Sequence, residues 1–323
     1  MRAPAAAPSL AVSLGPLALR NPVLTASGTS GYGLDLAPFM ELSRLGGIVC
    51  KSLSLRPREG NAPSRLAETP SGMLNSIGLQ NIGVETFLQE KLPQLRRHDV
   101  AIIANIFGES VEEFAQLAAR LERAEGLSAV ELNISCPNTD KGGIEFGVDP
   151  EATARVTEAV RRATRLPLIV KLSPNVTDIT VIARAAVSAG ATLLSLVNTF
   201  VGMAIDVERR APVLSSGSGG LSGPAIRPLA VHLTQRVARA VQVPLIGIGG
   251  IRTGRDALEF LMAGASAVQV GTSTFTEPAA AVRIVDELEA WCRDHGVREI
   301  ASLVGEIHRG PAPPAGPGAR AGG

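Results

Sequence analysis

Short apolar stretches rich in valine, isoleucine and leucine recur along the chain, and a longer stretch of mixed polar and apolar residues follows each one. The eight apolar stretches are 21–27, 46–52, 101–107, 129–135, 167–173, 192–199, 244–250 and 267–273. Within them apolar residues follow one another directly, with little polar alternation. Such continuity is typical of strands that are buried on both faces of a parallel sheet.

The segments between these stretches have the length and residue types of helices. They are 35–45, 84–97, 110–125, 150–164, 177–190, 224–241, 253–264 and 277–295. Ser110, Asp178 and Thr253 stand where N-terminal caps are expected, and the pairs Ala189-Gly190 and Ala263-Gly264 stand where helices should end. Eight strands alternating with eight helices predict a (β/α)₈ TIM barrel of parallel strands. An open doubly wound sheet is the alternative.

Length, composition and charge are compatible with one large barrel. The chain has 323 residues, of which 45% are hydrophobic, and a formal net charge of +1. We expect a single barrel domain over 1–310 and a disordered Pro/Gly-rich tail over 311–323. The balanced charge gives no electrostatic basis for binding nucleic acid or a membrane surface. The chain has no apolar stretch of transmembrane length, and prolines near its start argue against a signal peptide, so we expect a cytoplasmic protein.

Polar residues and glycines stand at the carboxyl end of each predicted strand. They are Ser27, Lys51, Asn105, Asn133, Lys171, Asn198, Gly249-Gly250 and Gly271-Thr272. Each alone is compatible with a turn, a helix cap or a solvated side chain. In a barrel, however, they would all face one mouth, and the two long connections from Leu53 to Gly83 and from Phe200 to Gly223 would lie at the same end. We therefore expect the active site there.

The last two strand ends predict a phosphate site. The segments GIGGIRTG (247–254) and VGTS (270–273) supply glycines that let the backbone approach a ligand closely, and Thr272 supplies a hydroxyl. Ordinary turns are the alternative reading of these glycines. The phosphate can belong to a flavin mononucleotide, in which case Lys171 would face the flavin ring and stabilise the negative charge gained on reduction.

Cys136 lies in the segment NISCPN, just beyond the fourth predicted strand. A thiol there can act as nucleophile, redox group or proton acceptor. The other two cysteines, Cys50 and Cys292, are widely spaced, which suggests neither a disulfide nor a metal site, and three cysteines cannot hold a four-cysteine iron–sulfur cluster. All four histidines fall in predicted helices or the tail, so a general base is favoured over a nucleophile. Gly142, Gly143 and Gly147 predict that the following loop is a mobile lid.

Several longer motifs together resemble the dihydroorotate dehydrogenases from about Leu10 to Glu306. They are VCKS (49–52), MLNSIGLQN (73–81), NISCPN (133–138), VKLSPN (170–175), VNT (197–199), GGLSGPAIRP (219–228) and IGIGGI (246–251). The segment NTFVGM followed by GGLSGPAI is similar to the NAD-linked class 1B catalytic subunit rather than to the fumarate-linked class 1A enzyme. Cys136 separates the chain from the membrane-associated class 2, whose base is serine.

This resemblance implies an FMN-dependent oxidation of (S)-dihydroorotate to orotate in pyrimidine (UMP) biosynthesis. Cys136 would take the C5 proton while a hydride passes from C6 to flavin N5. The matching substrate-binding positions are Lys51, Asn75, Ser76, Ile77, Gly78, Leu79, Asn133, Asn198 and Thr199. The matching FMN positions are Ser27, Lys51, Ser52, Asn105, Asn133, Lys171, Val197, Gly223, Gly249, Gly250, Gly271 and Thr272. No metal site is expected.

The resemblance also implies a partner. It is an electron-transfer subunit that carries FAD and a [2Fe–2S] cluster and passes electrons to NAD⁺, and two copies of this chain would pair within a heterotetramer. Two other functions remain open at this point. One is a flavin barrel of the dihydropyrimidine dehydrogenase type, which acts on uracil or thymine, and the other is a barrel that binds FMN or a sugar phosphate without turnover.

Overall fold

Eight parallel strands form a closed barrel in the computed structural model, which describes residues 7–135, 137–138 and 144–309. The strands are β3 (Val23–Thr25), β4 (Gly47–Val49), β7 (Ala101–Ile106), β8 (Ala129–Asn133), β11 (Leu168–Leu172), β12 (Leu193–Leu196), β17 (Leu245–Ile248) and β18 (Ala267–Val270). Neighbours in the barrel follow chain order, and β18 closes the ring by pairing with β3. The predicted TIM barrel is confirmed and the open sheet is excluded.

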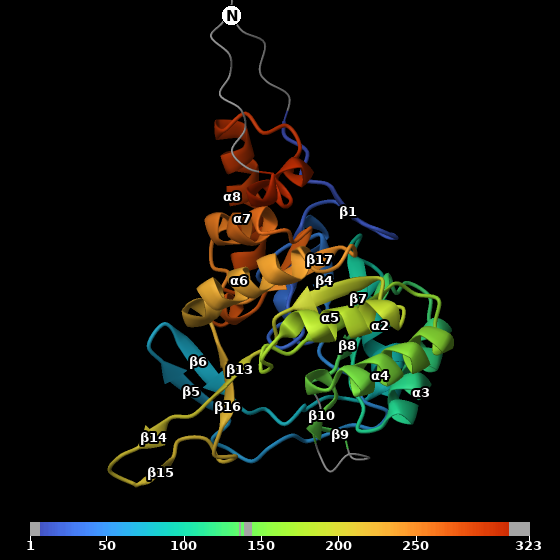
Figure 1. The fold of residues 1–323 in the computed structure, drawn as a ribbon, viewed down its shortest axis with the longest axis vertical. Helices are drawn as coiled ribbons and strands as arrows, with labels where there is room; N and C mark the ends of the chain where they lie inside the picture. The colour runs from blue at the N-terminus through green and yellow to red at the C-terminus, as the bar shows by residue number, and fades with distance from the viewer. Residues whose placement is uncertain (1–6, 136, 139–143, 310–323) are drawn as a thin grey trace, which may run out of the picture.

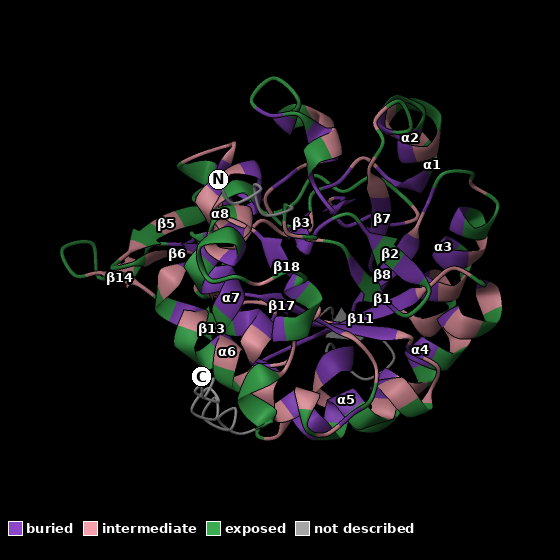
Figure 2. Cartoon of the chain, turned by 90° about the horizontal axis from the view of Figure 1, so that it is seen from above, coloured by how far each residue is buried: buried purple, intermediate pink, exposed green. Residues whose placement is uncertain are grey.

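The barrel strands are buried almost throughout, as their continuous apolar sequence predicts. Every residue of the eight strands is buried except Ala101, which is partly exposed. In Figure 2 the buried positions gather in the central strands, while exposed positions lie on the outward faces of the helices. Each strand lies inside its predicted stretch and ends one or more residues before the stretch does.

Six of the predicted helices are regular α-helices that cover the outside of the barrel (Figure 1). They are α3 (Val111–Glu122), α4 (Pro150–Ala163), α5 (Ile179–Ser188), α6 (Arg227–Ala238), α7 (Gly254–Met262) and α8 (Ala280–Asp294), with the short turn η6 (Pro224–Ile226) leading into α6. Ser110, Asp178 and Thr253 are N-caps whose side chains accept backbone N–H bonds, as predicted. Gly190 and Gly264 follow the ends of α5 and α7 with φ of 103° and 114°.

The predicted helix at 84–97 is present but not uniform. It consists of α1 (Val84–Thr86), the wider π turn η3 (Phe87–Lys91) and α2 (Leu92–Leu95). Pro93 has no N–H to donate to the preceding turn, which favours an irregular helix at this point.

The predicted helix at 35–45 is wrong. Two 3₁₀ turns, η1 (Leu34–Leu36) and η2 (Leu42–Arg44), occupy this segment. Pro38 removes a backbone donor between them, and Glu41 is extended at φ −76° and ψ 110°, so an α-helix cannot continue.

Strands from the two long connections form one sheet beside the barrel mouth. The strands β5 (Leu66–Thr69), β6 (Gly72–Asn75), β13 (Phe200–Gly202) and β16 (Gly219–Ser222) form a four-stranded antiparallel sheet in the order β13-β16-β6-β5. A hairpin of β14 (Ile205–Asp206) and β15 (Ala211–Pro212) extends from it at the lower left of Figure 1. Segments more than a hundred residues apart in the chain are thus joined on one side of the barrel mouth.

Smaller elements complete the described chain. The antiparallel pairs are β1 (Val12–Leu14) with β2 (Leu17–Leu19) and β9 (Pro137–Asn138) with β10 (Ile144–Glu145). Short 3₁₀ turns are η5 (Phe146–Val148), η7 (Thr272–Phe275), η8 (Ile300–Leu303) and η9 (Glu306–His308). Among the described residues, no helix has the length and apolar character needed to cross a membrane.

Candidate active site

A cavity of about 520 Å³ opens at the carboxyl ends of the barrel strands, where the sequence predicts the site. Residues at or just beyond the carboxyl ends of β3, β4, β8, β11, β12, β17 and β18 line it, together with residues of both long connections. The predicted site residues that line it are Ser27, Lys51, Ser52, Asn75, Ser76, Ile77, Gly78, Leu79, Asn133, Lys171, Val197, Asn198, Thr199, Gly223, Gly249, Gly250, Gly271 and Thr272. The barrel therefore brings together groups that are spread over most of the chain.

Two predicted site residues stand apart from this set. Asn105 is fully buried and does not line the cavity; its Nδ2 donates to Glu131 Oε1 at 2.7 Å. Its Oδ1 has no hydrogen-bond partner among the described residues, so an acceptor remains available there. Cys136 lies outside the described residues, as do Gly142 and Gly143 of the predicted lid, whereas Gly147 is buried.

Two lysines give the cavity a positive electrostatic character. Lys171 is 6% exposed, and burial lowers the pKa of its ammonium while the Glu131 carboxylate raises it. Burial also lowers the pKa of Lys51, and the charges of Lys171 and Arg65 lower it further. A dianionic or anionic ligand would relieve this crowding of positive charge, because an opposite charge stabilises a buried ammonium.

Asparagine side chains supply groups that both donate and accept hydrogen bonds. Asn198 Nδ2 lies 3.5 Å from Asn133 Oδ1, and the same oxygen accepts from the Ser135 N–H at 3.3 Å. On the opposite side, Asn75 Nδ2 donates to the Gly220 carbonyl at 3.1 Å, which joins the two long connections. The cavity can therefore recognise a small ring that carries both N–H and C=O groups.

Glycines let the backbone close around one end of the cavity. Gly250 has φ of +70°, and a Cβ there would lie 2.7 Å from the Gly223 carbonyl oxygen. Gly223 has φ of +97°, and a Cβ there would lie 2.8 Å from the Gly72 Cα. Side chains at either position would be strained and would collide with neighbouring backbone atoms. Thr272 adds a hydroxyl, which donates to Ser222 Oγ at 2.9 Å.

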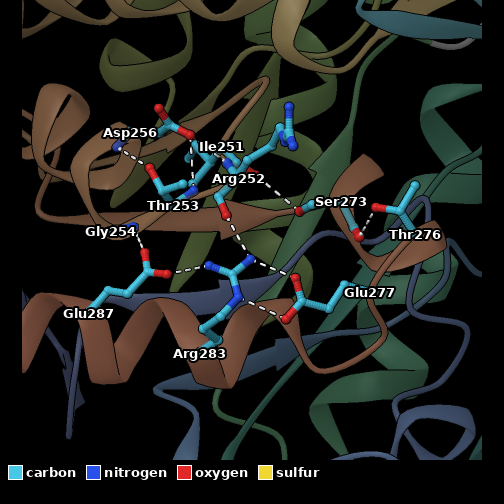
Figure 3. Close-up of polar contacts among 10 residues, drawn as sticks. All are labelled: Ile251, Arg252, Thr253, Gly254, Asp256, Ser273, Thr276, Glu277, Arg283 and Glu287. Atoms are coloured by element: carbon cyan, nitrogen blue, oxygen red, sulfur yellow. Dashed lines mark hydrogen bonds and ion pairs between the residues drawn. The ribbon is translucent and has the colours of Figure 1, made fainter.

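A polar cluster behind this end ties the loops after β17 and β18 together (Figure 3). Arg283 of α8 donates to both carboxylate oxygens of Glu277 at 2.7 Å and to the Arg252 carbonyl at 3.1 Å. Ser273 Oγ donates to the Ile251 carbonyl at 3.0 Å, which is a direct bond between the two loops. The glycine-lined end is thus held by side chains that do not enter the cavity.

Other lining residues were not predicted. They are Ala26, Gly28, Thr29, Asn61, Leu66, Met73, Ser135, Ser222, Ile226, Ile248 and Phe275. Most belong to the long connections or immediately follow a predicted strand end, so extending each strand-end position by one or two residues would have found several. Leu66 and Met73 reach the cavity through the sheet formed by the two connections, and no local pattern in the chain predicts this long-range pairing.

In the part of the chain that the structure describes, no group of three or more His, Cys, Asp or Glu side chains is arranged to hold a metal ion.

Comparisons with known proteins agree on one family. The family model described as dihydroorotate dehydrogenase matches residues 9–291. Proteins named dihydroorotate dehydrogenase B (NAD(+)), catalytic subunit, from Pelobacter propionicus and Trichlorobacter lovleyi are 55% and 54% identical to this chain over 300 residues. Each of these alignments covers 93% of this chain and 99% of the relative. The corresponding protein of Geobacter sp. (strain M21) is 51% identical over 93% of this chain and 98% of its own length.

A solved structure shares the fold. The DHODH of Eimeria tenella, in complex with ferulenol, superposes with a TM-score of 0.75 at 23% sequence identity. The superposition covers 93% of this chain and 89% of that one.

Proposed function

Because this chain belongs to the dihydroorotate dehydrogenase family, we propose that it oxidises (S)-dihydroorotate to orotate in pyrimidine biosynthesis, as the catalytic subunit of an NAD⁺-linked enzyme. Two observations carry the proposal. The chain is 51–55% identical to catalytic subunits of that name, and most of the residues expected to bind substrate and cofactor line one cavity.

The described residues fit FMN. Gly223, Gly249, Gly250, Gly271 and Thr272 would hold the phosphate end. The backbone packs closely there, because a Cβ at Gly223, Gly249 or Gly250 would collide with neighbouring protein atoms. Ser27, Ser52, Val197, Lys51, Asn133 and Lys171 would border the ring system, and the unpartnered Oδ1 of Asn105 would accept a hydrogen bond at its buried edge. When bound, FMN supplies the hydride acceptor, its N5 atom, for the hydride that leaves C6 of dihydroorotate.

The substrate would lie between the strand ends and the sheet of the long connections. Asn75, Asn133 and Asn198 would bond the N–H and C=O groups of the dihydropyrimidine ring, and Thr199 would add a hydroxyl. The stretch Ser76, Ile77, Gly78 and Leu79 would close over it, and the Lys51 ammonium would neutralise an anionic substrate. These contacts would orient C5 and C6 toward the two acceptors.

Cys136 is proposed as the general base that takes the C5 proton. The proton passes to the thiolate sulfur, the C5–H electron pair forms the C5=C6 double bond, and the C6 hydrogen leaves with its bonding pair. Burial raises the pKa of Cys50 to about 12 and also raises that of Cys292, so neither of these cysteines is suited to hold a thiolate. Ser135, which directly precedes Cys136 in the chain, lines the cavity.

Electrons must leave the bound cofactor for NAD⁺, and we propose a partner for this step. The words "catalytic subunit" in the relatives' names imply a further subunit. As the resemblance to the class 1B enzymes implies, it would carry FAD and a [2Fe–2S] cluster. The three cysteines of this chain are too few for the four cysteine ligands of such a cluster, which is compatible with a cluster in another subunit. We further propose that two copies of this chain pair within a cytoplasmic heterotetramer.

Substrate discrimination tests the proposed activity. Purified chain loaded with FMN is assayed with an artificial electron acceptor and either dihydroorotate or dihydrouracil, and the product is quantified. We expect orotate from dihydroorotate and at least 10²-fold lower kcat/KM with dihydrouracil, which lacks the carboxylate. Faster turnover of dihydrouracil would favour the dihydropyrimidine dehydrogenase type of activity, and no turnover of either would favour a binding protein.

A further inference from the structure

A carboxylate lies at the centre of the barrel, beneath the cavity, and the proposed reaction does not use it. Glu131 of β8 is fully buried and accepts three hydrogen bonds. Asn105 Nδ2 of β7 donates to its Oε1 at 2.7 Å, while Ser195 Oγ of β12 and Gln269 Nε2 of β18 donate to its Oε2 at 2.8 and 2.7 Å. Because the donors come from strands on different sides of the ring, the carboxylate must lie inside the barrel.

These three donors are neutral, so they solvate the carboxylate without cancelling its charge. A buried ionised group without a counter-charge is costly even when it is hydrogen-bonded. Residues next to Glu131 in the barrel should therefore include a cation.

Lys171 meets this requirement. It lies on β11, between β8 and β12, and it is paired in register with Asn133 on one side and Ser195 on the other. The carboxylate of Glu131 reaches from β8 to Ser195 on β12, and so it crosses beneath β11. The Glu131 carboxylate attracts the Lys171 ammonium and raises its pKa. The charge of Lys171 in turn lowers the pKa of Lys51.

We propose that Glu131 is a positioning residue whose buried carboxylate is the counter-charge that keeps Lys171 as an ammonium at the floor of the cavity. The inference rests on the proposed function in one respect, which is that Lys171 borders the FMN ring. Burial lowers the pKa of Lys171 and Glu131 opposes that effect. Without the carboxylate, Lys171 would lose its proton at lower pH, and with it the charge that favours a reduced, negatively charged ring.

The barrel allows this charge to be removed with little change in shape. Glu131→Gln is isosteric, and Gln269 Oε1, which has no hydrogen-bond partner among the described residues, can turn to accept from the new amide. The Ser195 hydroxyl can likewise reverse from donor to acceptor. Ser195→Ala is the matched control, because it removes one hydrogen bond from the carboxylate and leaves its charge.

Thermal unfolding of the full chain tests the charge pair in a double-mutant cycle. We expect Glu131→Gln to lower Tm by several degrees when Lys171 is present and to raise Tm in a Lys171→Met background, where the carboxylate is a lone buried charge. The same decrease in both backgrounds would overturn the proposal. Should Glu131→Gln fail to fold, folding of the double variant would support the pair, and failure of the double variant when Lys171→Met folds would contradict it.

The reduction potential of bound FMN, measured against pH in the holoenzyme, tests the consequence. We expect the bend in this profile that reports Lys171 to move to lower pH by about one unit in Glu131→Gln, to stay in place in Ser195→Ala, and to vanish in Lys171→Met. A bend that stays at the wild-type pH in Glu131→Gln would overturn the proposal, because the charge of Glu131 would then have no effect on Lys171. The unfolding cycle needs neither FMN nor substrate, so its result stands apart from the proposed activity, which is tested separately by whether dihydroorotate reduces the wild-type flavin.

Discussion

Among single residues, Lys51 should make the affinity for orotate depend on pH. Burial, Lys171 and Arg65 all lower the pKa of its ammonium. An amine is charged below its pKa, so affinity for the anion orotate should be full at lower pH and should fall as pH rises through this lowered pKa, below the range where an ordinary lysine titrates. The dissociation constant of orotate, followed by the absorbance of bound FMN across pH, measures this.

Lys51→Gln should weaken orotate binding by about 10–100-fold at neutral pH and remove its dependence on pH in this range, since a charged hydrogen bond contributes about 1.5–3 kcal/mol. Lys91→Gln is the control, because Lys91 lies on η3 and does not line the cavity. A wild-type dissociation constant for orotate that does not change with pH until the pH reaches the pKa range of an ordinary lysine would contradict this account.

Cys136 decides the rate of the chemical step in the proposed mechanism. Cys136→Ala should retain FMN and slow its reduction by dihydroorotate by about 10²–10⁴-fold, the usual contribution of a general base. Stopped-flow absorbance under anaerobic conditions measures the rate. Cys292→Ala is the control, since Cys292 is buried in α8 away from the cavity. Reduction at the wild-type rate in Cys136→Ala would remove this cysteine from the mechanism.

Residues at the strand ends could be predicted from the sequence because a parallel barrel sends all carboxyl ends to one face. Lys51, Asn133, Lys171 and Asn198 were found in this way. Glu131 was not, although it is a lone charge within the apolar run 129–135. A charge inside a buried strand is a signal that can be read, but its partners cannot, because Ser195 and Gln269 meet it only across the closed ring.

Arg283 matters at the scale of elements, because it connects α8 to the loops after β17 and β18. Arg283→Met should weaken FMN binding by about 3–10-fold, since partly exposed ion pairs contribute about 0.2–1 kcal/mol each and two of them are lost with a carbonyl contact. Fluorescence titration with FMN measures this. Arg293→Met, which removes an exposed ion pair on the same helix, should leave FMN affinity unchanged. Equal losses in both variants would show that the cluster does not support the phosphate end.

The barrel strands and most helices followed from sequence because their periodicity is local. The helix predicted at 35–45 does not form, because Pro38 and the extended Glu41 interrupt the segment despite its apolar helical pattern. The sheet formed by the two long connections was not predicted, because β6 pairs with β16 across more than a hundred residues. The pairing of short glycine-containing strands leaves little periodic signal in either segment.

For the whole molecule, one surface feature bears on assembly. Exposed apolar side chains gather on the segment from β13 to Val207, which we call the arm. Val201 and Ile205 lie on β13 and β14, Met203 lies between these strands and Val207 follows β14, and their exposed fractions are 56–74%. If two copies of the chain pair through this arm, Val207→Glu should shift the dimer toward monomer, because a charge would be buried at the interface. Sedimentation velocity measures the distribution.

Val181→Glu is the matched control for this variant, since Val181 is 42% exposed on α5, outside the arm. It should leave the dimer intact. A Val207→Glu variant that remains fully dimeric would exclude the arm as the interface.

The central claim is that the cavity holds FMN and oxidises dihydroorotate, and one measurement tests it most directly. Purified chain is mixed anaerobically with dihydroorotate in the absence of any other electron acceptor, and the visible flavin band is followed. The account predicts that the band bleaches while orotate forms in an amount equal to the flavin reduced. A flavin that dithionite bleaches but dihydroorotate does not would contradict the account, and so would a chain that binds no FMN.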